Sequence, residues 1–223
     1  MGGAMFAPAK PAAPPEAPNI LLISIDSLRR DHVSAYGYPR ATTPRIDALA
    51  REGVRFDMAI APTSWTLPSH VTLLTSLPAR LHGAREFRQR FSRDVVTLAE
   101  VLSDTGYATA GFVAGSFLSA THGFSQGFDV YDDYTILERE RGEYGGHLTS
   151  PRSIALARRW LDEREGSGRE RPFFLFLHMW DVHYEYPSGL LDQWWSAAGG
   201  KEGESADIDP SQIEVLKSLG YLK

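Results

Sequence analysis

The chain has 223 residues, of which 43% are hydrophobic, enough to bury one sizeable core and to favour one domain or at most two. The net charge of -5 and the dispersed Lys and Arg residues argue against a polyanion-binding surface, so no nucleic acid partner is expected. No apolar run reaches the ~18 residues of a membrane helix, and no transmembrane segment is predicted. The absence of cysteine excludes disulfide bonds but indicates no compartment.

The first segment, residues 1–17, is rich in Pro and Ala. Such a composition predicts a flexible or extended lead-in. The segment lacks a basic region followed by a continuous apolar region, so no signal peptide is predicted.

Strand and helix patterns alternate after residue 18. Short continuous apolar runs at residues 19–25, 109–114 and 172–178 are typical of parallel strands that are covered on both faces. Helix patterns separate them. This repetition predicts an α/β fold with a mostly parallel sheet between two layers of helices.

Three of the helix patterns carry recognisable start or end signals. They are Thr43 as N-cap before Pro44 with an end at Gly53, the capping box Thr97 to Glu100 with an end near Gly106, and residues 153–163. In the last helix we expect Ile154, Ala157 and Leu161 to face inward.

A further helix start, in residues 61–76, is the most informative feature of the chain. Thr66 stands two residues before Pro68, and apolar residues follow at helical spacing, so Thr66 is expected at a helix N-terminus. Unpaired backbone N–H groups and the helix dipole favour a phosphate or sulfate group there. An ordinary helix start is the alternative interpretation, because Ser, Thr and Pro are common at such positions.

Two polar residues end predicted strands. Asp26 follows the first apolar run, and His178 ends the third. Ligands of such sheets bind beyond the carboxyl ends of the strands, so both side chains are expected to point into one crevice beside the start of the Thr66 helix. Asp26 offers an oxygen ligand for a divalent cation. Alternatively it caps the turn over residues 27–30.

Several segments in a fixed order resemble the sulfatase family of the alkaline phosphatase superfamily, over about residues 18–187. They are Pro18 to Gly37, Thr42-Thr43-Pro44, Thr66-Leu67-Pro68-Ser69-His70, the Gly106 to Phe112 and Gly123 to Asp129 segments, and His178 to His183. The resemblance implies a three-layer αβα, alkaline-phosphatase-like fold and a hydrolase of sulfate esters.

The resemblance also implies roles for single residues. Asp26 and Thr66 would bind a divalent cation, calcium in the first place, with manganese, zinc or magnesium as alternatives. Thr66 would be the nucleophile, and His183 and His70 would contact the ester or its leaving group. The substrate would be a small sulfate or phosphate ester. Relatives of this family are often periplasmic or extracellular.

This chain departs from the family pattern at the nucleophile. The family converts Cys or Ser to formylglycine, and Thr is not a substrate for that conversion, so no formylglycine is expected at Thr66. An unmodified Thr is the nucleophile in the phosphodiesterase and phosphonoacetate-hydrolase branches of the superfamily, which makes phosphodiester or phosphonate hydrolysis a rival expectation. His70 stands where the family has Arg, and Ser27 where many members have a second Asp.

Other residues of the motifs have supporting roles. His178 and Asp181 are expected to orient neighbouring groups. For His82, in a His-Gly pair, a structural role is the first interpretation.

The largest departure is an absence. No Asp-His-Gly or Asp-Asn-Gly follows Asp181, although the family takes its remaining metal ligands from such a segment. The chain therefore resembles a truncated fold, with the N-terminal half joined through an internal deletion to a linker and a short C-terminal helix over residues 188–223. Loss of half the sheet would expose an edge, so self-association through this edge is expected.

Three hypotheses for the function follow. The first is metal-assisted hydrolysis of sulfate esters by a hydroxyl nucleophile, with phosphodiester or phosphonate hydrolysis by unmodified Thr66 as its rival. The second is an inactive remnant that only binds anions. The third and weakest is a metal-free triad of Thr66, His183 and an Asp.

Overall fold

The computed structural model describes residues 11–14, 16–86, 89–133, 150–166 and 171–182. All of them belong to the first of two compact units, Met1–Tyr184. The linker and C-terminal helix expected over residues 188–223 lie outside the described residues and stay predictions.

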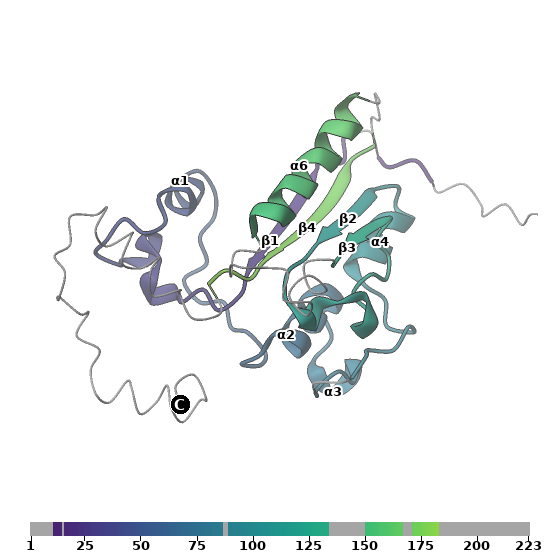
Figure 1. Cartoon of the computed structure of the whole chain (residues 1–223), viewed down its shortest axis with the longest axis horizontal. Coiled ribbons are helices and arrows are strands. Elements are labelled where there is room, and N and C mark those ends of the chain that lie inside the picture. Colours follow the sequence, from purple (N-terminus) through teal and green to yellow (C-terminus); the bar gives the residue numbers. More distant parts are fainter. Residues whose placement is uncertain (1–10, 15, 87–88, 134–149, 167–170, 183–223) are drawn as a thin grey trace, which may run out of the picture. The chain divides into compact units, whose positions relative to one another are not determined.

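A four-stranded parallel sheet forms the centre of this unit (Figure 1). Its strands are β1 (Ile20–Ile25), β2 (Ala108–Phe112), β3 (Val130–Asp132) and β4 (Phe173–Met179). The order is β1-β4-β2-β3, and every neighbouring pair is parallel. The three strands predicted from apolar runs are confirmed, and β3 was not predicted. Because β4 lies beside β1 and runs parallel to it, the carboxyl ends of these two strands lie side by side.

Helices connect the strands. They are α1 (Pro44–Glu52), α2 (Thr66–Thr75), α3 (Ala79–His82), α4 (Leu98–Asp104) and α6 (Ser150–Gly166). Four short 3-10 turns are also described, at Arg30–His32, Ser34–Tyr36, Ser116–Leu118 and Ala120–His122. The predicted capping box is confirmed, because Thr97 accepts from the Glu100 N–H and Glu100 from the Thr97 N–H.

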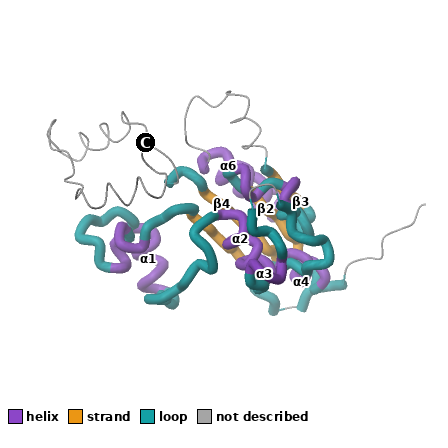
Figure 2. Tube along the Cα trace, turned by 90° about the horizontal axis from the view of Figure 1, so that it is seen from below, coloured by secondary structure: helices purple, strands orange, loops and turns teal. Residues whose placement is uncertain are grey.

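The helices lie in two layers, α6 on one side of the sheet and α2, α3 and α4 on the other (Figure 2). Side chains of β4 alternate between two apolar clusters, as strand geometry requires. Phe174 and Phe176 pack toward the cluster that contains Leu67 and Val71 of α2. Leu175 and Leu177 pack against Ala157 of α6. The predicted three-layer αβα fold with a mostly parallel sheet is therefore confirmed.

The inward face predicted for α6 needs one correction. Ala157 is buried and Leu161 packs against the core, but Ile154 is 37% exposed. The buried positions of α6 include Ser153, one residue and about 100° of helix before Ile154, so Ile154 turns toward the rim. On the face of the sheet that α6 covers, the edge strand β1 is also partly exposed: Leu21 is 53% exposed and Ile23 44%.

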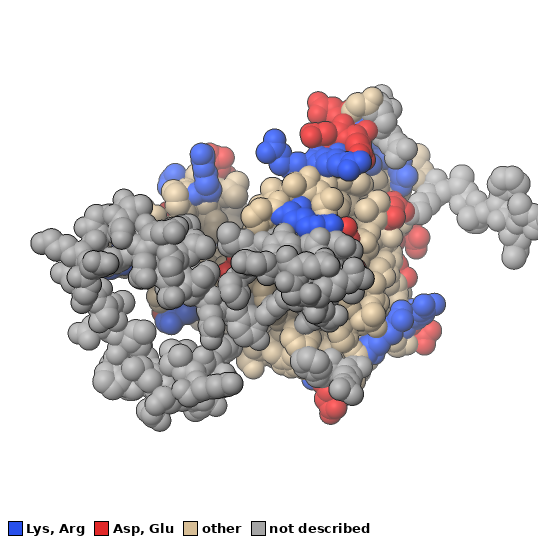
Figure 3. Space-filling view, in the orientation of Figure 1, with Lys and Arg blue, Asp and Glu red and all other residues tan. Residues whose placement is uncertain are grey.

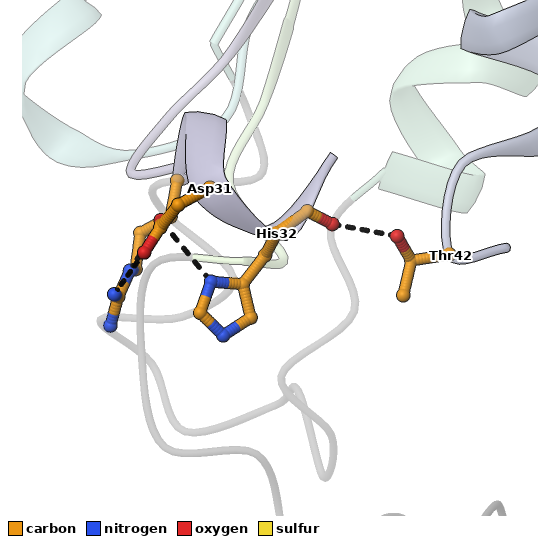
Figure 4. Close-up of polar contacts among 4 residues, drawn as sticks. Asp31, His32 and Thr42 are labelled. Atoms are coloured by element: carbon orange, nitrogen blue, oxygen red, sulfur yellow. Dashed lines mark hydrogen bonds and ion pairs between the residues drawn. The ribbon is translucent and has the colours of Figure 1, made fainter. Parts of the chain in front are cut away.

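Residues 30–60 are built differently from the sheet. Val33 is their only buried residue, and α1 buries none. Polar contacts hold the segment: Ser34 Oγ donates to Asp47 Oδ2 at 2.6 Å, and Thr43 Oγ1 donates to Asp47 Oδ1 at 3.0 Å. Asp31 contacts the His32 ring, and Thr42 Oγ1 donates to the His32 carbonyl at 2.6 Å (Figure 4).

Charged side chains of both signs are mixed on the face drawn in Figure 3, for example over the upper end of α6. Among the described residues, no helix is both long enough and apolar enough to cross a lipid bilayer.

Candidate active site

Asp26 follows the last residue of β1. Its N–H donates to the Met179 carbonyl at 2.9 Å, which continues the pairing with β4 by one residue. Ser27 then takes a left-handed conformation, with φ +56°, and its Oγ donates to Asp26 Oδ1 at 3.2 Å. A non-glycine residue at positive φ carries strain that costs of order 1 kcal/mol. The chain turns sharply here, and the Asp26 side chain is only 10% exposed.

Thr66 is the first residue of α2, as its sequence context predicts. The preceding Trp65 is extended and its side chain makes no capping hydrogen bond, so the positive end of α2 lies at Thr66 without a cap from this residue. Thr66 is 5% exposed, and its Oγ1 donates to Asp26 Oδ2 at 2.8 Å. The hydroxyl thus lies between a carboxylate and a helix N-terminus.

His178 reaches the same carboxylate from β4. It pairs with Ser24 across the β1–β4 ladder and is fully buried. Its Nε2 lies 3.4 Å from Asp26 Oδ2, the oxygen that also accepts from Thr66. Among the described residues its Nδ1 has no hydrogen-bond partner. Thr66 and His178, which follow Asp26 by 40 and 152 positions in the sequence, therefore meet at one Asp26 oxygen, where the strand ends predicted a common crevice.

His70, one turn into α2, has both ring nitrogens engaged. Nδ1 donates to the Thr66 carbonyl at 2.9 Å, and since a carbonyl only accepts, Nδ1 carries the proton. Nε2 then accepts from Ser24 Oγ at 2.8 Å. Burial first, and then the nearby His178 ring, which stands edge-on at 5.0 Å, lower the pKa of His70 to about 4. A neutral His70 therefore joins the start of α2 to β1.

The residues predicted for the site are thus placed as follows. Asp26 and Thr66 lie in direct contact, and His70 touches Thr66 through its backbone. His183 lies outside the described residues, and its role stays a prediction. Ser24 was missed, although a hydroxyl on the penultimate residue of an apolar strand is the signal that points to it.

Two further residues have structural contacts. His82 is 2% exposed, and its Nδ1 accepts from the Ala84 N–H at 3.2 Å while Nε2 contacts Thr72 Oγ1. Asp181 accepts from the Ser150 N–H at 3.1 and 3.2 Å, which places a carboxylate at the N-terminus of α6.

The donor atoms fit part of a divalent-metal site. Asp26 and Thr66 supply oxygens and His178 a nitrogen, which are ligand types for calcium, magnesium or zinc. Calcium usually takes six to eight oxygens, however, and the described residues hold no group of three or more His, Cys, Asp or Glu arranged to bind a metal ion. The described residues therefore match such a site in kind but supply only a few of its ligands.

The family model described as Sulfatase matches residues 18–198. The chain belongs to the sulfatase family. Arylsulfatase A of Bos taurus is 41% identical over 249 aligned positions, which cover 92% of this chain and 49% of that protein. An N-acetylglucosamine-6-O-sulfatase of Bacteroides thetaiotaomicron is 26% identical to this chain, and the alignment covers 31% of that protein.

Among solved structures, the phosphonate monoester hydrolase of Agrobacterium radiobacter superposes with a TM-score of 0.59 at 22% identity, over 75% of this chain and 41% of that one. This likeness supports the alkaline-phosphatase-like fold. The chain spans about half the length of the bovine relative, or less of the other two proteins.

Proposed function

We propose that this chain carries the nucleophile-bearing part of a sulfate ester hydrolase, with Thr66 as the attacking residue. One observation carries the proposal: the Thr66 hydroxyl, at the N-terminus of α2, donates to Asp26 Oδ2 at 2.8 Å. Membership of the sulfatase family and the names of the relatives support sulfate esters as the substrate class.

The described residues would divide the work in a simple way. The N-terminus of α2 attracts the anionic ester group, since its N–H groups and dipole favour negative charge. Asp26 accepts the hydrogen bond of the Thr66 hydroxyl and so directs the oxygen lone pairs toward the sulfur. His178, buried behind Asp26, fixes the carboxylate, and His70 holds the Thr66 backbone. His183 is the proposed proton donor to the leaving alcohol.

A divalent cation would bind at Asp26 and Thr66, with calcium proposed first. When bound, it would lower the pKa of the hydroxyl and offset the negative charge of the ester oxygens. Residues or waters beyond those described would have to complete its ligand set.

A second candidate is hydrolysis of phosphodiesters or phosphonates. Thr66 itself favours it, because Thr does not become formylglycine and an unmodified hydroxyl acts as a nucleophile toward phosphorus in related branches. A third candidate is an inactive protein that binds sulfate or phosphate without turnover.

The test is turnover of nitrophenyl esters of sulfate, phosphodiester and phosphonate, each with calcium, manganese, zinc or magnesium, and with EDTA. We expect sulfate ester hydrolysis that needs a cation. Thr66→Val keeps the side-chain shape but removes the hydroxyl, so activity should fall by at least about 1,000-fold. Thr75→Val is the matched control in the same helix, because among the described residues its hydroxyl bonds only to Val71 of α2 and to Leu77.

The outcomes separate the candidates. Faster turnover of the phosphorus esters, still dependent on Thr66, favours the second candidate. Sulfate binding by calorimetry without turnover, lost in Thr66→Val, favours the third. Activity that survives in Thr66→Val contradicts the proposal. If activity is lost, circular dichroism must show that the variant is folded.

A further inference from the structure

The face of β1 that is turned toward α2 changes from apolar to polar along the strand. Alternate residues of a strand point to the same face. Ile20 and Leu22 of this face pack against the apolar cluster to which α2 contributes. Ser24 and Asp26 continue the face, and their side chains bond to residues in the first turns of α2. One face of β1 therefore packs against the helix and also bonds to its N-terminal end.

These bonds attach Thr66 to β1 at two points. The Thr66 hydroxyl donates to Asp26 Oδ2 at 2.8 Å. The Thr66 carbonyl accepts from His70 Nδ1 at 2.9 Å, and His70 Nε2 in turn accepts from Ser24 Oγ at 2.8 Å. The side chain of Thr66 is thus bonded to β1 directly, and its backbone is bonded to β1 through the His70 ring.

The second attachment replaces something that the start of α2 lacks. Trp65 gives the helix no side-chain cap, and helix ends without one fray readily. Fraying would move the Thr66 hydroxyl away from Asp26, and a misplacement of about 1 Å in a reacting group can lower a rate about 100-fold. The bond from Ser24 through His70 opposes this movement, because it joins the first turn to a strand of the sheet.

The His70 ring is poorly suited to contact a substrate. The residue is 7% exposed, and both of its ring nitrogens already have partners within the fold. An ester oxygen would have to displace Ser24 or the Thr66 carbonyl to reach either nitrogen. The family resemblance implies contact with the ester at this position, whereas the hydrogen bonds favour a role inside the fold.

We propose that Ser24 and His70 are positioning residues that hold Thr66 against Asp26, and that His70 does not bind the ester. The inference rests on the proposed role of Thr66 as the attacking residue. Ser24 acts through His70 alone, because its hydroxyl bonds to no other group among the described residues.

Ser24→Ala tests the role of the hydroxyl. With the nitrophenyl ester that the wild type hydrolyses fastest, kcat should fall about tenfold while KM stays within about twofold, because only the placement of Thr66 is disturbed. Ser24→Thr keeps a hydroxyl on the strand and should restore kcat. A higher KM with an unchanged kcat would assign Ser24 and His70 to substrate binding and overturn the proposal.

A double variant tests the route through His70. His70→Asn keeps an amide donor close to the position of Nδ1 but is too short to reach Ser24. Adding Ser24→Ala to His70→Asn should lower kcat no further than His70→Asn does alone, since residues that act as one unit are not additive. Additive losses overturn the route. If Ser24→Ala does not fold, His70→Asn with Ser24→Thr still tests the attachment.

Sulfate binding tests the claim that His70 does not contact the ester. The probe is inorganic sulfate, titrated by calorimetry into the wild type and into His70→Asn. The two dissociation constants should agree within about twofold, because a positioning residue makes no direct contact with the anion. A loss of affinity of about tenfold or more in His70→Asn overturns this part of the proposal.

The position of Thr66 can also be followed without any turnover. In protein labelled with ¹³C at the threonine methyl groups, Thr66→Val identifies the Thr66 signal. This signal should be single and sharp in the wild type, shifted or broadened in Ser24→Ala, and restored in Ser24→Thr. An unchanged signal in Ser24→Ala overturns the proposal. If the signals behave as expected and no ester is hydrolysed, the proposed function fails while the attachment of Thr66 stands.

The matched control is Thr72→Val. The Thr72 hydroxyl contacts Nε2 of the buried His82 at 3.2 Å, so this variant removes the same kind of hydroxyl–imidazole contact from α2. It lies six positions beyond Thr66, and it should leave kcat and the Thr66 methyl signal unchanged. If Thr72→Val changes them as much as Ser24→Ala does, the effect is a general loosening of α2 and the proposal is overturned.

Discussion

The strand β4 and residues 30–60 are stabilised in opposite ways. Five consecutive residues of β4, from Phe174 to His178, are buried between two layers of helices. Residues 30–60 bury only Val33 and are held by hydrogen bonds and ion pairs at the surface. Apolar burial contributes about 25 cal/mol per Å², whereas exposed ion pairs contribute ~0–1 kcal/mol each.

The contrast separates two tasks within one unit. The sheet and its helices fix Asp26, Thr66 and His178 with a packed core behind them, as a site that must hold a defined geometry requires. Residues 30–60 leave several large apolar side chains exposed and are held mainly by polar contacts at the surface. They are therefore expected to open locally at a lower free energy than the sheet.

The largest expected difference comes from the same substitution in the two regions. Phe176→Ala, at a fully buried position of β4, should lower the free energy of unfolding by about 3–5 kcal/mol through lost burial and a cavity. Phe56→Ala, 70% exposed, should change it by less than about 0.5 kcal/mol. Urea denaturation of each variant measures both changes. Equal losses would mean that residues 30–60 unfold together with a core that includes Phe56.

A smaller difference is expected at the two helix starts. Thr97→Ala removes the capping box of α4 and should lower the free energy of unfolding by about 1 kcal/mol. Thr43→Ala removes the contacts to Asp47 and Ser34 at α1, which buries no residue. It should instead speed hydrogen exchange of the α1 amides while the global transition stays in place. A large shift of the global midpoint in Thr43→Ala would contradict the division into two regions.

The smallest expected effect is a dependence of stability on pH from the packed region. Burial lowers the pKa of His82 below its usual 6.5, because the charged ring loses water. The unfolded chain thus binds the proton more readily, and stability from this group is complete above pH ~6.5 and falls as the pH drops through the folded pKa. His82→Gln should reduce this slope in denaturation at a series of pH values. Leu81→Ala, at a 60% exposed neighbour, should leave the slope unchanged, and an identical slope in His82→Gln would refute the assignment.

Much of the fold was predictable because its signals are local. Apolar runs located β1, β2 and β4 to within one or two residues, and Thr43, Thr66 and Thr97 marked helix starts correctly. β3 was missed because three residues are too few for a periodic pattern. Ile154 was placed inward because periodicity does not reveal which strands a helix covers.

The candidate site was predictable only in part. Strand ends and the start of α2 pointed to Asp26, Thr66 and His178, and the order of motifs identified the family. The hydrogen bonds of both His70 nitrogens, to Ser24 and to the Thr66 carbonyl, could not be predicted from the sequence. Ser24 comes close to His70 only when β1 packs beside α2.

The sequence by itself determined most of the elements, their order and the sulfatase family, because helix caps, periodicity and motifs depend on neighbouring residues. Only the tertiary structure decided that β4 lies beside β1, that one Asp26 oxygen meets both Thr66 and His178, and that the apolar side chains of residues 54–60 face solvent. Parallel pairing joins residues about 150 positions apart, and no local preference of the chain specifies such a contact.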